Sequence, residues 1–270
     1  MPAAEATSRR TRPAEEPAED GLFVHSVEKA FRVLDAFGGG ARAMGLTEIA
    51  NATGLDRSAA QRFTHTLERL GYLAKDPRTR QYSLTIRTLE LGARYVRSSP
   101  LVDRATPYLL DLSRATEEAV SLTVLDGTEI VYLSRLLSRH MLRTNVNVGS
   151  RLPAYCTAPG RAMLARLPRA AARRLILASD RRTWTPQTVV AVPALLDKLE
   201  EAVARGFALA CGEIYPGDVS VAAAVLDADG QPYAAVNVAA SLARCTPDAA
   251  MERFAPLVIS TAAALSEPRR

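Results

Sequence analysis

The sequence predicts an α+β chain of two domains, a small helical domain that ends in a hairpin and a larger domain of mixed strands and helices. The length of 270 residues is enough for two domains, and the hydrophobic content of 48% is enough to fill their cores. Apolar residues recur at helical spacing through residues 27–70, whereas strand-like segments joined by turns recur after residue 119. These two patterns predict the two domains in that order.

Composition excludes several classes of protein. Residues 1–21 are mainly Pro, Ala, Glu and Arg, which predicts a disordered tail. They lack the apolar core of a secretory signal, and no apolar run approaches the roughly 18 residues of a membrane span. The three cysteines, Cys156, Cys211 and Cys245, lie far apart, and no pair has metal-site spacing. We therefore expect a reduced, cytoplasmic protein without a membrane partner, metal or cofactor.

Three helices are predicted in the first domain, residues 22–84. Apolar side chains from Val27 to Phe37 recur every three or four residues, and the glycines at 38–40 end this helix. A short second helix is predicted to begin with Thr47 as its N-cap and to end at a glycine turn. Asp56 is the predicted N-cap of a third helix over residues 57–70. The face of this helix that is expected to be buried consists of Ala60, Phe63, Leu67 and Leu70.

The outer face of the third helix is polar and basic, and a hairpin follows it. Residues 72–74 and 81–84 have the pattern of two short strands, and the turn between them carries a basic tip. Between residues 57 and 97 there are nine Lys or Arg against three acids, whereas the whole chain has a net charge of only +5. Two helices joined by a glycine turn, with a hairpin after the second, form a winged helix-turn-helix.

A local positive charge on such a motif favours double-stranded DNA as the partner. Base reading and helix positioning are assigned to Thr47, Ser58, Gln61, Arg62 and His65. Phosphate contacts are assigned to Arg57, Arg69, Arg78 and Arg80. The alternative is a winged helix that contacts protein or RNA.

Residues 85–99 predict an amphipathic linker helix. Ile86, Leu89, Ala93 and Val96 form its apolar stripe, and Pro100 prevents the helix from continuing. Because DNA readers gain specificity by binding two half-sites as dimers, the stripe is expected to help pair two chains. The alternative is that it packs on its own domain.

The second domain, residues 100–268, shows two hairpins among helices. The turns are Asp126-Gly127 and the segment 227–230. The predicted strands are residues 120–125, 129–136, 142–148, 219–226 and 233–240, and the predicted helices are 101–116, 157–178, 193–205 and 247–266. This order indicates a mainly antiparallel sheet covered by helices.

Cys156 is the cysteine whose position could make it a reactive thiol. Cys156 precedes a predicted helix, where a thiol can become a nucleophile. However, no histidine or acid lies close in sequence to serve as its base, and no phosphate-binding or metal motif is present. A buried structural cysteine is therefore favoured and no enzymatic activity is expected. The alternatives are a thiol enzyme or a redox sensor that uses Cys156 or Cys211.

The chain resembles the IclR family of bacterial transcriptional regulators from about residue 22 to 268. The matching segments are SVEKA at 26–30, LTEIA at 46–50, LERLGYL at 67–73, the segment 84–92, VGSRLP at 148–153, the segment 157–165 and Gly206-Phe207. The resemblance implies a GAF-like effector-binding domain and dimers, or dimers of dimers, on DNA. Effectors of this family are small organic acids or aromatic catabolites.

The resemblance also implies an effector pocket beside the sheet. Carried over by position, its residues are Tyr155, Cys156, Thr157, Gly160, Cys211, Ser220, Asn237 and Ala239. The segments 135–141 and 145–157 resemble regulators of the β-ketoadipate pathway and of related aromatic-acid degradation. The chain departs from that subgroup at residues 210–219, in the expected pocket wall. These features predict a regulator of a catabolic operon that responds to a small organic or aromatic acid.

Overall fold

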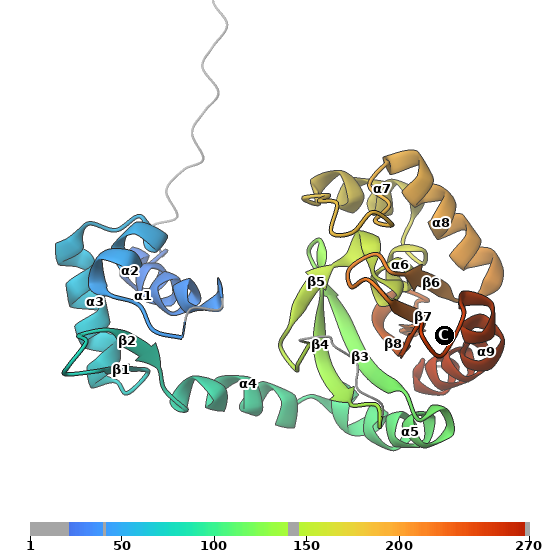
Figure 1. The fold of residues 1–270 in the computed structure, drawn as a ribbon, viewed down its shortest axis with the longest axis horizontal. Coiled ribbons are helices and arrows are strands. Elements are labelled where there is room, and N and C mark those ends of the chain that lie inside the picture. Colours follow the sequence, from blue (N-terminus) through green and yellow to red (C-terminus); the bar gives the residue numbers. More distant parts are fainter. Residues whose placement is uncertain (1–21, 40–41, 140–145, 268–270) are drawn as a thin grey trace, which may run out of the picture. The chain divides into compact units, whose positions relative to one another are not determined.

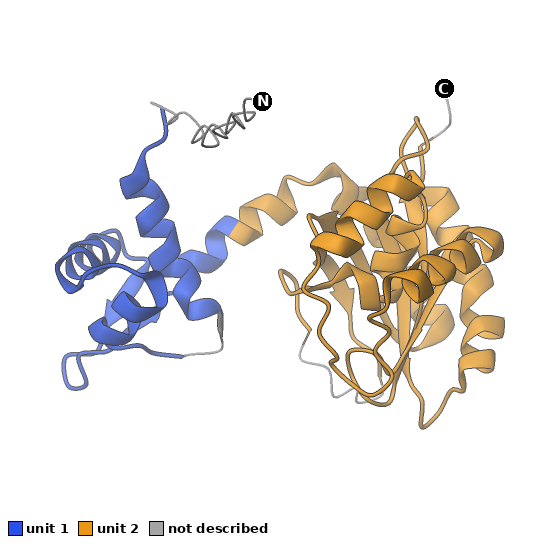
Figure 2. Cartoon of the chain, turned by 90° about the horizontal axis from the view of Figure 1, so that it is seen from above, with its two compact units in different colours: residues 1–91 blue, residues 92–270 orange. Residues whose placement is uncertain are grey.

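The computed structural model describes residues 22–39, 42–139 and 146–267, so the predicted tail lies outside the described residues. The chain divides into two compact units, residues 1–91 and residues 92–270 (Figure 2). The division falls inside α4 (Arg87–Arg97), within the segment predicted as the linker. The α+β class predicted from the sequence is confirmed.

The described part of the first unit consists of helices followed by a hairpin (Figure 1). Its elements are α1 (His25–Asp35), the 3-10 turn η1 (Ala36–Gly39), α2 (Leu46–Thr53), α3 (Arg57–Arg69), β1 (Leu73–Lys75) and β2 (Tyr82–Leu84). Val33, Ile49 and Leu67 from the three helices meet Leu73 and Tyr82 from the hairpin in one core. This core fixes α3 against α1, α2 and β1, so the opposite side of α3 faces solvent.

The N-terminal caps of α2 and α3 can be compared with the two caps predicted from the sequence. Asp56 caps α3 as predicted, because its Oδ1 accepts a hydrogen bond of 2.8 Å from the Ala59 amide. The prediction that Thr47 caps α2 is wrong. Gly45 is the cap, its amide donates to Oε2 of Glu48 at 2.6 Å, and Thr47 lies exposed in the first turn of the helix. Leu70, the C-cap of α3, is 51% exposed and not buried as expected.

Helix α4 buries none of its own residues. Leu89 is 64% exposed, and Ile86 just before the helix is 79% exposed. Val96 is half-buried against the core of the second unit. The first half of the apolar stripe is therefore not covered by its own unit. The alternative that the stripe packs on its own domain does not hold for this half.

In its described residues, the second unit is a six-stranded antiparallel sheet with helices on both faces. The strand order is β5-β4-β3-β8-β7-β6. The strands are β3 (Ala119–Asp126), β4 (Glu129–Leu136), β5 (Arg151–Pro153), β6 (Ala208–Cys211), β7 (Asp218–Leu226) and β8 (Pro232–Ser241). The helices are α5 (Pro100–Thr116), the 3-10 turn η2 (Ala154–Cys156), α6 (Ala158–Leu164), α7 (Arg169–Ala178), α8 (Val192–Arg205) and α9 (Pro247–Leu265).

The period of two along the central strands produces two separate cores. Val219 and Val221 of β7 and Val238 of β8 pack with α5 and α9 on one face. Ala222 of β7 and Ala235 of β8 point to the other face, which α6 covers. The candidate pocket described below lies on this second face.

Two predicted elements differ from the structure. The single helix predicted over residues 157–178 is α6 and α7, because Pro168 lies between them and cannot extend a helix that has already begun. The strand predicted over residues 142–148 is not formed at 146–148, where the Asn147 amide donates to Ser150 Oγ at 2.9 Å and Gly149 turns the chain at a φ of 85°. Residues 142–145 lie outside the described residues.

Candidate functional site

The solvent side of α3 carries six of the nine residues that the sequence assigns to DNA. Arg57, Ser58, Gln61, Arg62, His65 and Arg69 are all exposed. On the opposite side Ala60 and Leu67 are buried, and the buried Thr64 hydroxyl donates to the Ala60 carbonyl at 2.8 Å. The helix therefore satisfies its inner polar group locally and leaves its outer donors and acceptors available.

The β1–β2 turn presents two more of these residues. Oδ1 of Asp76 accepts hydrogen bonds from the amides of Arg78 (2.8 Å) and Thr79 (3.3 Å), and these bonds hold the Asp76 pKa below its usual value. Arg80 has a φ of 60°, the left-handed conformation that closes the turn. The Arg78 and Arg80 side chains are exposed, and so is Thr47 on α2, which packs beside α3.

A small cavity of about 40 Å³, partly open to solvent, lies in the second unit on the α6 side of the sheet. Its walls come from β4, β7, β8, the start of α6 and the loop between β6 and β7. Five residues that the sequence assigns to the effector line it, namely Cys156, Thr157, Ser220, Asn237 and Ala239. Its lining combines apolar and aromatic side chains with a few polar groups, which is the composition of a site for a small organic molecule.

Three other residues assigned to the effector do not line this cavity. Tyr155 is turned away, since its hydroxyl donates to the Arg182 carbonyl at 2.6 Å and accepts from Nε1 of Trp184 at 3.2 Å. Gly160 packs against the backbone of Ala154. Cys211 pairs with Val219 and shares its face of the sheet, so Ala210, one residue earlier, lines the cavity instead.

A β-bulge brings Arg135 to the cavity. Strict alternation along β4 from the buried Tyr132 would place residue 135 on the opposite face. The register between β3 and β4 shifts between Leu122 and Thr123, so that Ser121 pairs with Arg135. Arg135 then lies above the Tyr132 ring at 5.8 Å, donates from Nη1 to Ser121 Oγ at 3.2 Å, and lines the cavity.

Two buried oxygens of the cavity wall have no hydrogen-bond partner, Oδ1 of Asp218 and Oδ1 of Asn237. The amide nitrogen of Asn237 donates to Ser220 Oγ at 3.0 Å, and rotating the amide would only replace the unpartnered oxygen by an unpartnered nitrogen. Burial raises the pKa of Asp218 to about 7, although the charge of Arg135 opposes this shift. A buried polar group without a partner is costly, and a ligand in the cavity could supply it.

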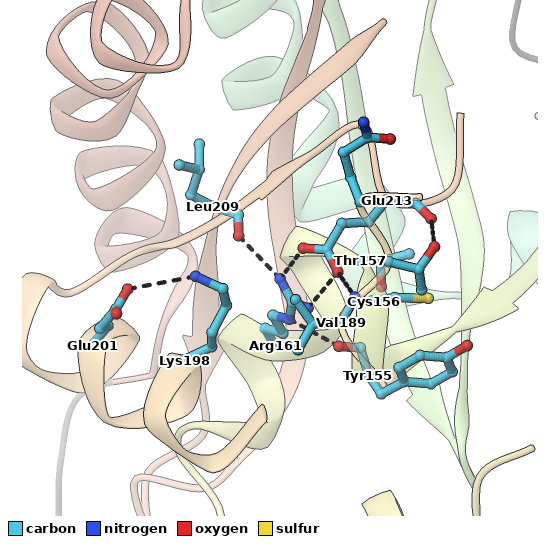
Figure 3. A network of polar contacts seen from close by, with 12 residues as sticks. Tyr155, Cys156, Thr157, Arg161, Val189, Lys198, Glu201, Leu209 and Glu213 are labelled. Atoms are coloured by element: carbon cyan, nitrogen blue, oxygen red, sulfur yellow. Dashed lines mark hydrogen bonds and ion pairs between the residues drawn. The ribbon is translucent and has the colours of Figure 1, made fainter. Parts of the chain in front are cut away.

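A buried ion pair fixes the loop that forms one wall of the cavity (Figure 3). Arg161 of α6 and Glu213 of the loop form a double contact, which includes Nη2 to Oε2 at 2.7 Å, and the two side chains are 1% and 5% exposed. Arg161 also donates from Nε to the Tyr155 carbonyl at 2.8 Å. Oε2 of Glu213 accepts from the Val189 amide at 3.1 Å, and the Thr188 hydroxyl donates to its carbonyl at 2.6 Å.

The cysteines are not arranged for nucleophilic chemistry. All three are free thiols. Burial raises the Cys156 pKa to about 12 and also raises the pKa of Cys211, so both thiols are held in the unreactive neutral form. Among the described residues, no group of three or more His, Cys, Asp or Glu side chains could hold a metal ion.

Sequence reasoning missed Arg135, Arg161, Glu213 and Asp218. The sequence places Arg135 at the end of a predicted strand and at the start of the segment 135–141 that resembles the β-ketoadipate regulators. The bulge that turns its side chain inward leaves no sequence pattern. Arg161 stands 52 residues before its partner. In the sequence, the segment containing Glu213 and Asp218 is marked only by its departure from the related subgroup. The sequence signal that could have identified them is the presence of two acids, Glu213 and Asp218, in the otherwise uncharged stretch 210–219.

Comparison with known proteins places these features in a family. Residues 26–77 match the family model of the IclR helix-turn-helix domain, and residues 93–267 match that of the bacterial transcriptional regulator IclR C-terminal region. The chain is 33% identical over 242 residues to the Pca regulon regulatory protein of Pseudomonas putida, covering 89% of this chain and 82% of that protein. It is 30% identical over 245 residues to the p-hydroxybenzoate hydroxylase transcriptional activator of Acinetobacter baylyi, covering 89% and 90%.

The fold agrees with a solved structure. The IclR transcriptional regulator from Alicyclobacillus acidocaldarius superposes with a TM-score of 0.79 at 27% identity, covering 91% of this chain and 98% of that one. The chain belongs to the IclR family of bacterial transcriptional regulators. It is a regulator with a DNA-binding domain and an effector-binding domain, and not an enzyme. In the described part of the chain, no helix is long and apolar enough to cross a membrane.

Proposed function

We propose that this regulator binds a DNA operator as a homodimer or a dimer of dimers, responds to a small aromatic or other organic acid, and controls a catabolic operon in the cytoplasm. Residues 22–84 form its DNA-binding domain, 85–99 its linker and 100–268 its effector domain. The observation that carries the ligand class is the cavity on the sheet, where Arg135 provides a positive charge beside the ring of Tyr132. Two relatives that regulate the Pca regulon and p-hydroxybenzoate hydroxylase support an aromatic acid.

In this proposal α3 enters the major groove and the β1–β2 turn contacts the backbone or minor groove. The effector acts by binding one arrangement of the paired domains more tightly than another, because only a difference in affinity can shift that equilibrium. Selection of genomic fragments by the purified protein, with and without 4-hydroxybenzoate or protocatechuate, tests both parts. An enriched palindrome whose affinity changes with one acid is the expected result. Failure to enrich any sequence at low salt contradicts operator binding.

Replacing Arg62 by alanine is expected to weaken operator binding by about 1–3 kcal/mol, because a bidentate contact to a base edge is lost. Fluorescence anisotropy with the selected operator measures the change. Arg174→Ala, in the exposed part of α7, removes the same charge from the other unit and should leave operator affinity unaltered. Equal affinity of the Arg62 variant and the wild type would remove Arg62 from the base-reading residues.

Replacing Leu89 by aspartate is expected to weaken dimerisation at least ten-fold, because a charge would enter the apolar stripe that we place between two chains. Sedimentation equilibrium measures the monomer–dimer constant. Leu137→Asp is the matched control, since Leu137 is 75% exposed on the second unit. An unchanged constant in the Leu89 variant contradicts pairing through the linker.

A further inference from the structure

The cavity contains an acid where an anionic ligand is expected. Asp218 stands at the start of β7, and its Oδ1 is buried, lines the cavity and has no hydrogen-bond partner. Arg135 lines the same cavity and acts on Asp218 through its charge. If Asp218 were ionised, its carboxylate would compete with the ligand's carboxylate for that positive charge. Two carboxylates that share one small site cannot both remain ionised at low cost.

Apart from Arg135, the titratable groups around Asp218 do not supply a positive charge. Those around Asp218 in the described residues are Arg135 and Tyr132 of β4, Cys211 of β6, Glu213 and Tyr215 of the following loop, and Cys156 before α6. Glu213 is neutralised by Arg161. Burial raises the pKa of both tyrosines and of both cysteines, so these four are neutral near pH 7. Of these groups, Asp218 is the one whose charge can adjust.

We propose that Asp218 binds the effector's carboxylate in its protonated form, so that the pocket takes up an organic anion together with one proton. The inference rests on the proposed function. The protonated carboxyl donates its O–H to one ligand oxygen while Arg135 offers the positive charge. The proton comes from solvent when Asp218 is ionised beforehand and is already present when it is not. Charge then balances, with one cation, one anion and one neutral acid in the cavity.

This linkage predicts how affinity depends on pH. The pKa of Asp218 in the free protein is about 7, so below pH 7 the acid is already protonated and the Kd is constant. Above pH 7 each pH unit costs a factor of ten, because one proton is taken up with each anion. Between pH 6 and pH 8.5 the Kd for 4-hydroxybenzoate is expected to rise about thirty-fold. Calorimetry in two buffers of different ionisation enthalpy measures the proton uptake directly.

Asp218→Asn tests the residue. The amide imitates the protonated acid, so its Kd for 4-hydroxybenzoate should stay flat with pH and remain close to the wild-type value at pH 6. Asp111→Asn, at an exposed site on α5, should keep the wild-type slope. 4-Hydroxybenzamide is the matched ligand, because it has no charge and should show no proton uptake. A flat wild-type profile, or a slope that survives in Asp218→Asn, overturns the proposal.

The test separates failure of this inference from failure of the proposed function. Binding of 4-hydroxybenzoate with no role for Asp218 overturns the inference and leaves the acid ligand in place. If none of 4-hydroxybenzoate, protocatechuate and benzoate binds a full-length protein that still binds its operator, the aromatic acid ligand is wrong and the inference falls with it.

A measurement without ligand checks that the Asp218→Asn variant is folded. The Asp218 pKa is raised on folding, so the stability gained by the neutral acid is complete below about pH 4 and is lost as pH rises through about 7. Asp218→Asn does not suffer this loss. Its melting temperature should therefore exceed that of the wild type at pH 8 and equal it near pH 4. A variant that melts lower at both pH values contradicts the view that burial of Asp218 destabilises its ionised form.

Discussion

Replacing Glu213 by alanine is expected to lower the free energy of unfolding of the second unit by about 3–5 kcal/mol. The substitution leaves the Arg161 guanidinium, 1% exposed, with only backbone carbonyls as partners. It also frees the Val189 amide, so the loop before β7 loses its attachments to α6 and to Val189, and keeps only the bond from the Thr188 hydroxyl to the backbone carbonyl of residue 213. Urea denaturation followed by the fluorescence of Trp184, the single tryptophan, measures the change in this unit.

Two variants control this prediction. Arg169 and Glu200 form an ion pair whose side chains are 65% and 62% exposed, so Glu200→Ala should cost less than about 1 kcal/mol. Combining Arg161→Met with Glu213→Leu removes both buried charges and should recover much of the lost stability. Should Glu213→Ala cost no more than Glu200→Ala, the buried pair is not what holds the cavity wall.

The first unit was predicted well because its signals are local. The period of α3 decides by itself which side is buried, so the exposed row from Ser58 to Arg69 follows from the sequence. Asp56 could be identified as a cap because its carboxylate bonds only three residues along the chain. Thr47 was misplaced for the same local reason. A glycine with an extended backbone competes as a cap, and the Glu48 side chain completes it from within the helix.

The candidate pocket depends on features that no local pattern contains. Position 211 was assigned by matching, but one residue of register in β6 decides whether Cys211 or Ala210 faces the cavity. A bulge in β4 reverses the side of Arg135. The short strands β5 and β6, of three and four residues, are too short to show a period of their own. Each of these is set by the register of pairing with a neighbouring strand, which the residues of one strand do not encode.

Gly160 shows how a position can be essential near a pocket without touching a ligand. A Cβ at residue 160 would lie 2.7 Å from the carbonyl carbon of Ala154, and closer still to its oxygen and Cα. Backbone atoms cannot move aside as a flexible side chain can. Gly160→Ala is therefore expected to cost about 3 kcal/mol or more by overpacking, measured as the shift in urea midpoint by Trp184 fluorescence.

The expected change in ligand binding follows from the same contact. Moving α6 away from η2 would displace Cys156 and Thr157, so Gly160→Ala should weaken 4-hydroxybenzoate binding together with stability. Gly92→Ala is the control. Nothing lies within 4 Å of its Cβ position in the exposed part of α4, and alanine there should be neutral or stabilising by up to about 1 kcal/mol. A Gly160 variant that binds the acid weakly but unfolds like the wild type would instead support a direct role of this residue in effector binding.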